Sequence, residues 1–209
     1  LFCKQIDEIA DGEKIDAIGV SCGGPLDEKR GVIMSPPNLP GWDDVEIKKF
    51  LENKYHVSVS VRNDANACAL AEWKFGAARG YSNVVFLTFG TGMGAGLILN
   101  GKLYSGTNGM AGEVGHIRLA PDGPWGFGKN GSFEGFCSGG GIAKMGKSEA
   151  ENALKNGNSL SYCKNIGEID GISAKKIAEC ANEGFDDAKE IYRKCAQKLG
   201  MGLSILIDV

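Results

Sequence analysis

Apolar and polar positions along the chain follow two periods, one typical of strands and one typical of helices. Residues 16–21 and 84–89 are short apolar runs that predict strands, and residues 57–61 alternate between Val and Ser as a half-buried strand does. The Asn100-Gly101 pair between apolar runs is a strong signal for a hairpin turn. The first half of the chain is therefore expected to contain several short strands.

Helices are predicted where apolar residues recur at intervals of three and four, or where helix-favouring residues are dense. Alanine is frequent in residues 65–75, and residues 186–208 place apolar side chains on one face. Asp44 is expected to cap the helix that follows it. The predicted helices span residues 1–11, 45–54, 65–75, 139–155, 173–182 and 186–208.

The first and last predicted helices lack the signals that usually begin and end a helix. No capping residue precedes the first, and neither glycine nor proline follows the helix that runs into Val209. We therefore expect the chain to be cut at both ends. The apolar face of the last helix could pack within its own domain or against a second copy in a homodimer or homotetramer, and the sequence leaves both open.

Composition excludes several classes of protein. The net charge of −3 gives no electrostatic footprint for nucleic acid, and no apolar run approaches the ~20 residues that cross a bilayer. The seven cysteines form an odd set without CxxC spacing, which argues against a disulfide scaffold or a cysteine-rich zinc site. Free thiols in apolar surroundings are typical of a reducing cytoplasm, so we expect a cytoplasmic protein without membrane or nucleic-acid partners.

Glycine is unusually frequent, with 32 residues of 209, and a cluster of it forms the motif GTGMGAG at residues 90–96. The motif lies between predicted strands at 84–89 and 95–99, so it lacks the following helix that dinucleotide-binding motifs and P-loops require. Glycines in a hairpin turn can still direct several backbone N–H groups at one anion. A phosphate site and an ordinary glycine-rich turn both remain open.

Two further groups of residues could carry chemistry. Asp64, in the motif NDANA at 63–67, follows a predicted strand and could act as a base, although it could equally cap the next helix. Glu113, His116 and Glu134 lie in a glycine-rich region, and two carboxylates with an imidazole suit the hydroxyls of a polyol. The alternatives are a core histidine and two surface carboxylates.

Six motifs follow one another along nearly the whole chain, namely IGVSCGGPLD (18–27), SPPNLPGW (35–42), NDANACALAEW (63–73), LTFGTGMGAGLILNGKLYSG (87–106), AGEVGH (111–116) and ExxxSGGG (134–141). In order and spacing they resemble the ROK family of repressors, open reading frames and kinases, and its glucokinase-like members in particular. The resemblance implies an α/β protein of the actin-like ATPase (ribonuclease H-like) fold, with two domains and a cleft between them. We expect residues 1–78 to belong to the smaller domain and residues 79–209 to the larger.

The resemblance also implies a function, the phosphorylation of a hexose or N-acetylhexosamine by ATP with Mg²⁺. Asp64 would be the general base that removes a proton from a sugar hydroxyl. The residues expected to bind the sugar are Gly24, Asn38, Asn63, Glu113, His116 and Glu134, and those expected to contact the ATP phosphates are Gly90, Thr91, Gly92 and Gly94. The alternative is the effector domain of a sugar-sensing ROK repressor, and which sugar is bound cannot be read from these motifs.

The chain departs from the family pattern at three places. The first phosphate motif, with its Mg²⁺-linked aspartate, and the closing adenosine segment are not in this sequence, so the chain alone is not expected to be active. Many members bind zinc through three cysteines and the histidine that corresponds to His116. Trp125, Phe127 and Ser132 occupy those three cysteine positions, and none is a usual zinc ligand. We therefore predict no zinc, with Trp125 and Phe127 packing apolar surface to brace the region and protein hydrogen bonds orienting His116.

Overall fold

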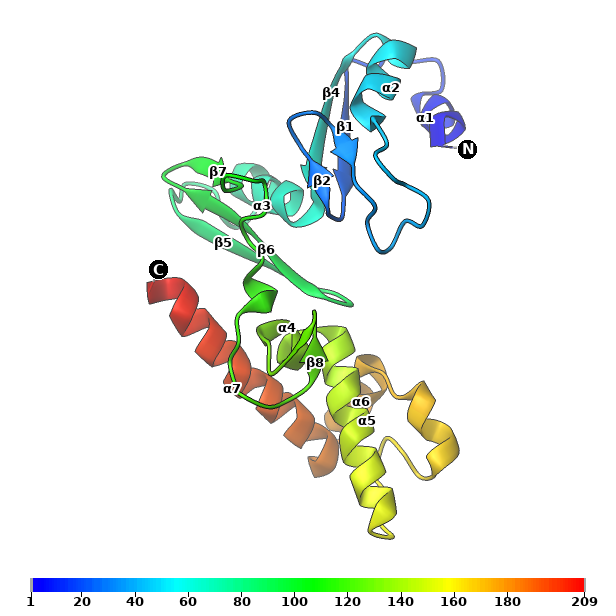
Figure 1. Ribbon diagram of the computed structural model, residues 1–209, viewed down its shortest axis with the longest axis vertical. Coiled ribbons are helices and arrows are strands. Elements are labelled where there is room, and N and C mark those ends of the chain that lie inside the picture. Colours follow the sequence, from blue (N-terminus) through cyan, green and yellow to red (C-terminus); the bar gives the residue numbers. More distant parts are fainter. Residues whose placement is uncertain (1, 209) are drawn as a thin grey trace. The chain divides into compact units, whose positions relative to one another are not determined.

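The computed structural model describes residues 2–208, which form two compact units (Figure 1). One unit contains the chain up to Val84 together with Gly96–Ala111, and the other contains Val85–Ala95 and the residues from Gly112 onward. This grouping follows contacts within the chain, and the domain boundary that we predict after residue 78 stays a prediction.

The first unit is built around two parallel strands, β1 (Ala17–Cys22) and β4 (Ser58–Asn63). Helices α1 (Phe2–Ala10) and α2 (Ile47–Tyr55) supply apolar side chains to one core with these strands, as Figure 1 shows for α2 beside the pair. A short antiparallel pair, β2 (Leu26–Asp27) and β3 (Val32–Ile33), adds Ile33 to that core.

Helix α3 (Asp64–Phe75) follows β4 directly and packs against both β1 and β4. A three-stranded sheet comes next, in the order β5 (Val84–Phe89), β6 (Met93–Leu99) and β7 (Lys102–Tyr104). Strands β6 and β7 are antiparallel and joined by Asn100 and Gly101, both with positive φ, which confirms the predicted Asn-Gly hairpin.

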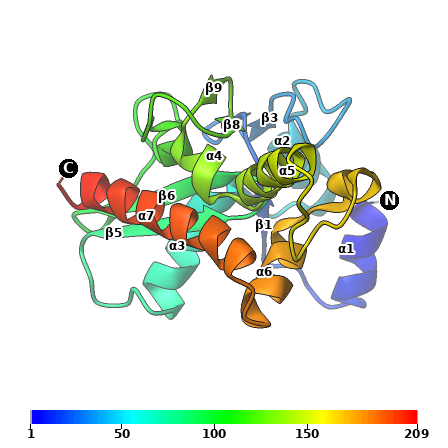
Figure 2. The ribbon, with the colours of Figure 1, turned by 90° about the horizontal axis from the view of Figure 1, so that it is seen from below.

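The second unit is mainly helical. Its short elements are η1 (Val114–His116), β8 (Trp125–Gly126), β9 (Lys129–Asn130), α4 (Phe133–Cys137) and η2 (Ile166–Gly171). Its longer helices are α5 (Gly139–Lys155), α6 (Ala174–Asn182) and α7 (Asp186–Asp208), which pack against one another (Figure 2). Within residues 2–208, no helix is both long enough and apolar enough to cross a membrane.

Packing in the second unit explains one of its glycines. Helix α4 lies against α7, and the fully buried ring of Phe133 fills the space beside Gly202. A side chain at position 202 would overlap that ring, so the glycine permits the two helices to approach closely.

One predicted helix start is wrong. Asp44 does not cap α2, because the N-cap position is Glu46 and the backbone at Asp44 is left-handed, with φ of 51°. Val45 instead bridges to Ile33 in an antiparallel contact, which continues extended structure past the residue where we expected the helix to begin.

Candidate active site

The carboxyl ends of β1 and β4 bring two sequence motifs together. Cys22 lies opposite Asn63 in the parallel register, so the loop after β1 starts beside the first residues of α3. A Cβ atom added to Gly23 would lie 4.0 Å from Asp64 Oδ2, and one added to Gly24 would lie 3.9 Å from Asn63 Nδ2. Ligands of open α/β sheets bind outside the carboxyl ends of the strands. Gly24, Asn63 and Asp64 therefore share one edge of a candidate site.

Asn63, and not Asp64, is the N-cap of α3. The Asn63 Oδ1 atom accepts hydrogen bonds from the backbone N–H groups of Ala65 at 3.0 Å and Asn66 at 3.3 Å. Asp64 is the first helical residue and is exposed, with Oδ1 accepting from the N–H of Ala65 at 2.9 Å. The cap alternative for Asp64 is therefore wrong, since the preceding residue supplies the cap.

Asp64 affects the pKa of Cys22, the last residue of β1. Burial raises the pKa of the Cys22 thiol, and the charge of Asp64 raises that pKa further. A thiol with a raised pKa stays protonated at neutral pH and is a poor nucleophile. The Cys22 thiol is therefore not a candidate nucleophile at these strand ends.

Glu28 holds this edge in place, although no sequence motif points to it. Its Oε1 atom accepts hydrogen bonds from the Asn63 backbone N–H at 2.8 Å and from Asn66 Nδ2 at 3.1 Å, and Arg62 lies 3.3 Å from Oε2. Only 10% of the Glu28 side chain is exposed, and a carboxylate this buried is tolerated when charged and polar partners surround it. The partners lie more than thirty positions away in sequence, so no local pattern could reveal them.

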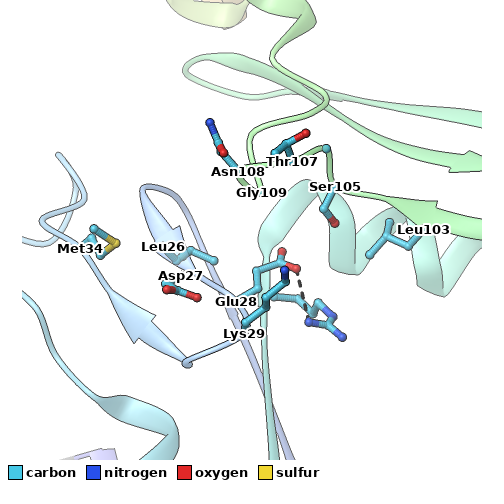
Figure 3. Close-up of a pocket in the computed structure, with 12 residues that line it drawn as sticks. Leu26, Asp27, Glu28, Lys29, Met34, Leu103, Ser105, Thr107, Asn108 and Gly109 are labelled. Atoms are coloured by element: carbon cyan, nitrogen blue, oxygen red, sulfur yellow. Dashed lines mark hydrogen bonds and ion pairs between the residues drawn. The ribbon is translucent and has the colours of Figure 1, made fainter.

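A cavity of about 620 Å³ opens next to Glu28 within the first unit. Figure 3 shows Leu26, Asp27 and Glu28 on one side of it and Thr107 and Asn108 on the other. Its lining consists of Leu26, Asp27, Glu28, Lys29, Met34, Arg62, Leu103, Ser105, Gly106, Thr107, Asn108 and Gly109. None of the residues predicted to bind the sugar or ATP is in that lining, and Glu28 with Arg62 connects the cavity to the strand ends.

Asn38 is exposed on the irregular segment between β3 and α2. The base of this loop is closed by hydrogen bonds from the Met34 N–H to the Pro25 carbonyl and from the Ser35 N–H to the Trp42 carbonyl. Because Pro25 follows Gly24, the loop that carries Asn38 starts beside the segment that leads away from β1. A sugar-binding role for Asn38 stays a prediction.

In the second unit the glycine-rich turn between β5 and β6 is held by side chains. The Gly94 N–H donates to Thr88 Oγ1 at 3.0 Å, and the Met93 N–H donates to Glu134 Oε2 at 3.0 Å. The Gly90 N–H donates to the Gly92 carbonyl at 3.0 Å. These bonds give the turn a fixed shape.

The N-terminus of α5 packs directly against the same turn. Ser138 caps the helix, and the N–H groups of Gly139 and Gly140 donate to the carbonyls of Gly90 at 2.8 Å and Thr91 at 3.2 Å. A Cβ added to Gly140 would lie 2.7 Å from the Thr91 oxygen, so this close approach requires glycine. The positive end of a 17-residue helix dipole therefore lies at the turn, which favours an anion there.

Glu113, His116 and Glu134 lie close to one another through η1 and α4. His116 Nε2 is 3.5 Å from Glu113 Oε2, and the His116 side chain is about a quarter exposed. A Cβ added to Gly115 would lie 3.2 Å from the Glu134 Cβ, so the tight packing at this glycine joins η1 to α4. Two carboxylates and an imidazole therefore gather beside the turn in this unit.

The side chains around His116 do not fit a zinc ion. Zinc takes four nitrogen, sulfur or oxygen ligands. Here the Phe127 ring is stacked on the imidazole with centroids 4.0 Å apart, and Ser132 Oγ is buried and caps α4 by accepting from the Gly135 N–H. Across residues 2–208, no group of three or more His, Cys, Asp or Glu side chains is placed to hold a metal. The absence of zinc stays a prediction for metal analysis.

Comparison with known proteins decides the family. A sequence model described as the ROK family matches residues 3–209. The chain belongs to the ROK family.

Relatives in the ROK family include kinases and repressors. A glucokinase of Streptomyces coelicolor is 37% identical over 199 residues, which cover 95% of this chain and 62% of that protein. A xylose repressor of Caldicellulosiruptor bescii is 31% identical over 193 residues, covering 92% of this chain and 47% of the repressor. The chain thus spans less than two thirds of the length of these relatives.

A solved structure confirms the predicted fold class. The ROK glucokinase of Streptomyces griseus, crystallised with glucose and AMPPNP, superimposes with a TM-score of 0.76 at 34% identity, covering 99% of this chain and 66% of that one. The chain therefore has the actin-like ATPase fold of ROK proteins, as the motif order predicted.

The predicted site residues fall into two groups. Gly24, Asn63 and Asp64 lie together in the first unit, and the glycine-rich turn lies with Glu113, His116 and Glu134 in the second. Each group is assembled from segments far apart in sequence. That the two groups serve one substrate is a proposal.

Proposed function

We propose that the protein containing this chain transfers the terminal phosphoryl group of ATP to a hydroxyl of a hexose or N-acetylhexosamine, with Asp64 as general base. The observation that carries the proposal is the position of Asp64. Its carboxylate is exposed where β4 meets α3, and Asn63 has taken over the structural task of capping the helix.

Asp64 would accept the proton as the sugar oxygen attacks the phosphorus. A positioned general base contributes typically ~10²–10⁴-fold in rate, and the remainder of phosphoryl-transfer catalysis is positioning and charge stabilisation. The Glu28 hydrogen bonds, which fix the backbone of Asn63 and the side chain of Asn66, would limit movement of the strand end that carries this base.

Sugar hydroxyls would be bound by Asn63, Glu113, His116 and Glu134, with Gly24 and Asn38 as further contacts. In Asn63 the cap bonds use Oδ1, so the amide Nδ2 is the atom that would donate to a hydroxyl. Carboxylates accept from hydroxyls, and the imidazole can donate or accept, so the set matches the mixed character of a sugar.

The phosphates of ATP would meet the turn that carries Gly90, Thr91, Gly92 and Gly94. The N–H groups of Gly90, Met93 and Gly94 already donate to protein acceptors. We therefore assign phosphate binding mainly to the N–H groups of Thr91 and Gly92, assisted by the dipole of α5. Mg²⁺ would be bound with the nucleotide, because in kinase sites it is held largely by phosphate oxygens and water with one or two carboxylates.

The alternative is a sugar-sensing repressor, and the likeness to a xylose repressor favours it. The two functions share the sugar contacts but differ in the need for a base. The residues that precede this segment in the parent protein also discriminate, because a phosphate motif supports the kinase and a helix-turn-helix supports the repressor.

The test is ADP release by the purified parent protein with glucose, mannose, fructose, allose and N-acetylated amino sugars. We expect turnover with at least one sugar, and a loss of about 10²-fold or more in Asp64→Asn with sugar binding retained by calorimetry. Asp16→Asn, another exposed aspartate that pairs with Lys14, is the matched control and should keep full turnover. Equal turnover in Asp64→Asn and the wild type would remove Asp64 from its role, and sugar binding without turnover in the wild type would favour the repressor.

A further inference from the structure

The turn between β8 and β9 has an unusual residue at its first central position. Gly126 pairs with Lys129, so the connection consists of Phe127 and Gly128, and both have positive φ, at 36° and 75°. A two-residue turn with positive φ at both positions strongly prefers Asn, Asp or Gly at the first. A bulky aromatic residue is strained there, because its Cβ approaches the backbone.

The strain is not explained by burial of the Phe127 ring in a core. The residue is 66% exposed, so it gains little from the hydrophobic effect. Its ordered contact is with His116, whose imidazole lies parallel to the ring at an interplanar angle of 9° and a centroid distance of 4.0 Å. A strained backbone held at a candidate functional residue points to a role in that function.

The hairpin is anchored to both of its neighbours by contacts that do not involve the Phe127 ring. Lys129 Nζ donates to the His116 carbonyl at 3.0 Å, and Lys144 Nζ of α5 donates to the Trp125 carbonyl at 2.8 Å. Ser132 Oγ also lies 3.4 Å from the Gly126 carbonyl. The turn is therefore expected to keep its place when the Phe127 ring is removed. A substitution of Phe127 can thus test the ring without disrupting the hairpin.

We propose that Phe127 is a positioning residue that fixes the plane of the His116 imidazole for sugar binding. The proposal rests on the proposed function. Stacking limits rotation of the imidazole out of its plane. The Glu113 carboxylate, with Oε2 at 3.5 Å from His116 Nε2, fixes which of the two ring nitrogens points toward Glu113. The edge of the imidazole then stays available to a sugar hydroxyl.

The test compares Phe127→Asn with Phe127→Tyr in the parent protein. Asparagine suits the positive φ and removes the ring, so the variant should fold at least as well as the wild type. Tyrosine retains the stack and serves as the matched control. If His56 and His116 are the only histidines of the protein used, as they are in this chain, the imidazole signals in an NMR spectrum are readily assigned.

In the wild type and in Phe127→Tyr, the ring protons of His116 should be shifted upfield by the stacked aromatic ring, and this shift should vanish in Phe127→Asn. The dissociation constant for the sugar found in the ADP-release panel should rise about three- to tenfold in Phe127→Asn and stay within about twofold in Phe127→Tyr. The KM for the sugar should rise with it, while kcat changes less. Zinc measured in the purified wild type should be far below one equivalent.

Three results would overturn the inference. They are a missing upfield shift in the wild type, unchanged sugar affinity in Phe127→Asn after the shift is lost, and one equivalent of bound zinc. Each leaves the proposed function standing if Asp64 still proves essential. If instead the wild type binds no sugar at all, the proposed function fails, and the positioning role fails with it even when the stack is present.

Discussion

Glu134 Oε2 accepts a hydrogen bond from the backbone N–H of Met93 at 3.0 Å. Glu134 lies in the first turn of α4, and Met93 begins β6 directly after the glycine-rich turn. The same carboxylate that we assign to the sugar therefore helps to shape the turn that we assign to ATP. A Cβ added to Gly92 would lie 2.8 Å from this oxygen, so the turn and the carboxylate are in close contact.

Replacement of Glu134 should separate its two roles. We expect Glu134→Ala to weaken both sugar binding and binding of a non-hydrolysable ATP analogue, the latter about tenfold, because a hydrogen bond to a charged group contributes ~1.5–3 kcal/mol. In Glu134→Gln the amide oxygen can still accept from the Met93 N–H, so nucleotide affinity should be largely kept while sugar affinity falls. Calorimetric titration of each ligand checks this, and equal nucleotide affinity in Glu134→Ala and the wild type would argue against the coupling.

Substitution of Gly140 by alanine should weaken nucleotide binding without touching the sugar residues. The added methyl group would lie 2.7 Å from the Thr91 oxygen and push the turn away from α5. Overpacking of this kind costs about 1–3 kcal/mol. If the turn shifts to relieve this strain, ATP affinity should fall by roughly five- to a hundredfold.

Gly200→Ala is the control for Gly140→Ala, because Gly200 lies in α7 and a Cβ there meets nothing within 4 Å. It should leave nucleotide affinity unchanged and stabilise the helix by up to ~1 kcal/mol. If both variants bind the nucleotide analogue like the wild type, contact between α5 and the turn is not important for the site.

Asn63 is expected to contribute both to protein stability, as the cap of α3, and to sugar binding. Two different substitutions should separate these contributions. Asn63→Ala removes the cap of α3 and should lower the free energy of unfolding by about 0.5–2 kcal/mol in urea titrations. Asn63→Ser keeps a cap acceptor but lacks the amide donor, so it should unfold near the wild-type midpoint and bind sugar more weakly. A serine variant as unstable as the alanine variant would contradict the cap assignment.

Protonation of Asp187 in acid should lower the stability of the helical unit. Burial favours the neutral form, but hydrogen bonds from the N–H groups of Ser161 and Ala188 outweigh it and hold the pKa of Asp187 below its usual value. A carboxyl group whose folded-state pKa is lowered stabilises the fold above its unfolded pKa, near 4, and that contribution disappears as the pH falls through the folded value.

The variant Asp187→Asn should therefore be less stable than the wild type at pH 7, by less than about 1 kcal/mol because solvent screens this partly exposed carboxylate, and the difference should shrink below pH 4. Urea titrations at pH 7, 5 and 3 check this. A stability gap that stays constant across this range would show that the charge of Asp187 is not the cause.

Local sequence signals predicted much of the fold. The helices at α5 and α7 begin and end where the apolar pattern placed them, and α3 differs from its prediction by one residue. The short elements β2, α4 and η2 carried too few residues for a periodic pattern, so they were not predicted. The helix start predicted at Asp44 is wrong because Asp is a common capping residue type, whereas the backbone at this position is left-handed.

The candidate site was predictable where the motif residues are neighbours in sequence, as with Asn63 and Asp64. The supporting contacts were not predictable, because each joins segments that are distant in sequence. Glu28 reaches Asn63 across 35 positions, and Glu134 reaches Met93 across 41. Which of the adjacent residues Asn63 and Asp64 caps α3 depends on backbone geometry, so only the structure could assign the cap to Asn63.

Glu28 has a practical consequence for engineering. The NDANA segment could be transplanted into another scaffold, or ROK sequences could be recombined at a junction between positions 28 and 63. Either change would separate the Glu28 carboxylate from its three partners, which are Arg62, the Asn63 backbone N–H and the Asn66 side chain. Such chimeras would retain every recognisable motif, and the candidate site around Asn63 and Asp64 would still be less firmly held. Parental residues at 28, 62 and 66 should therefore be inherited as one block.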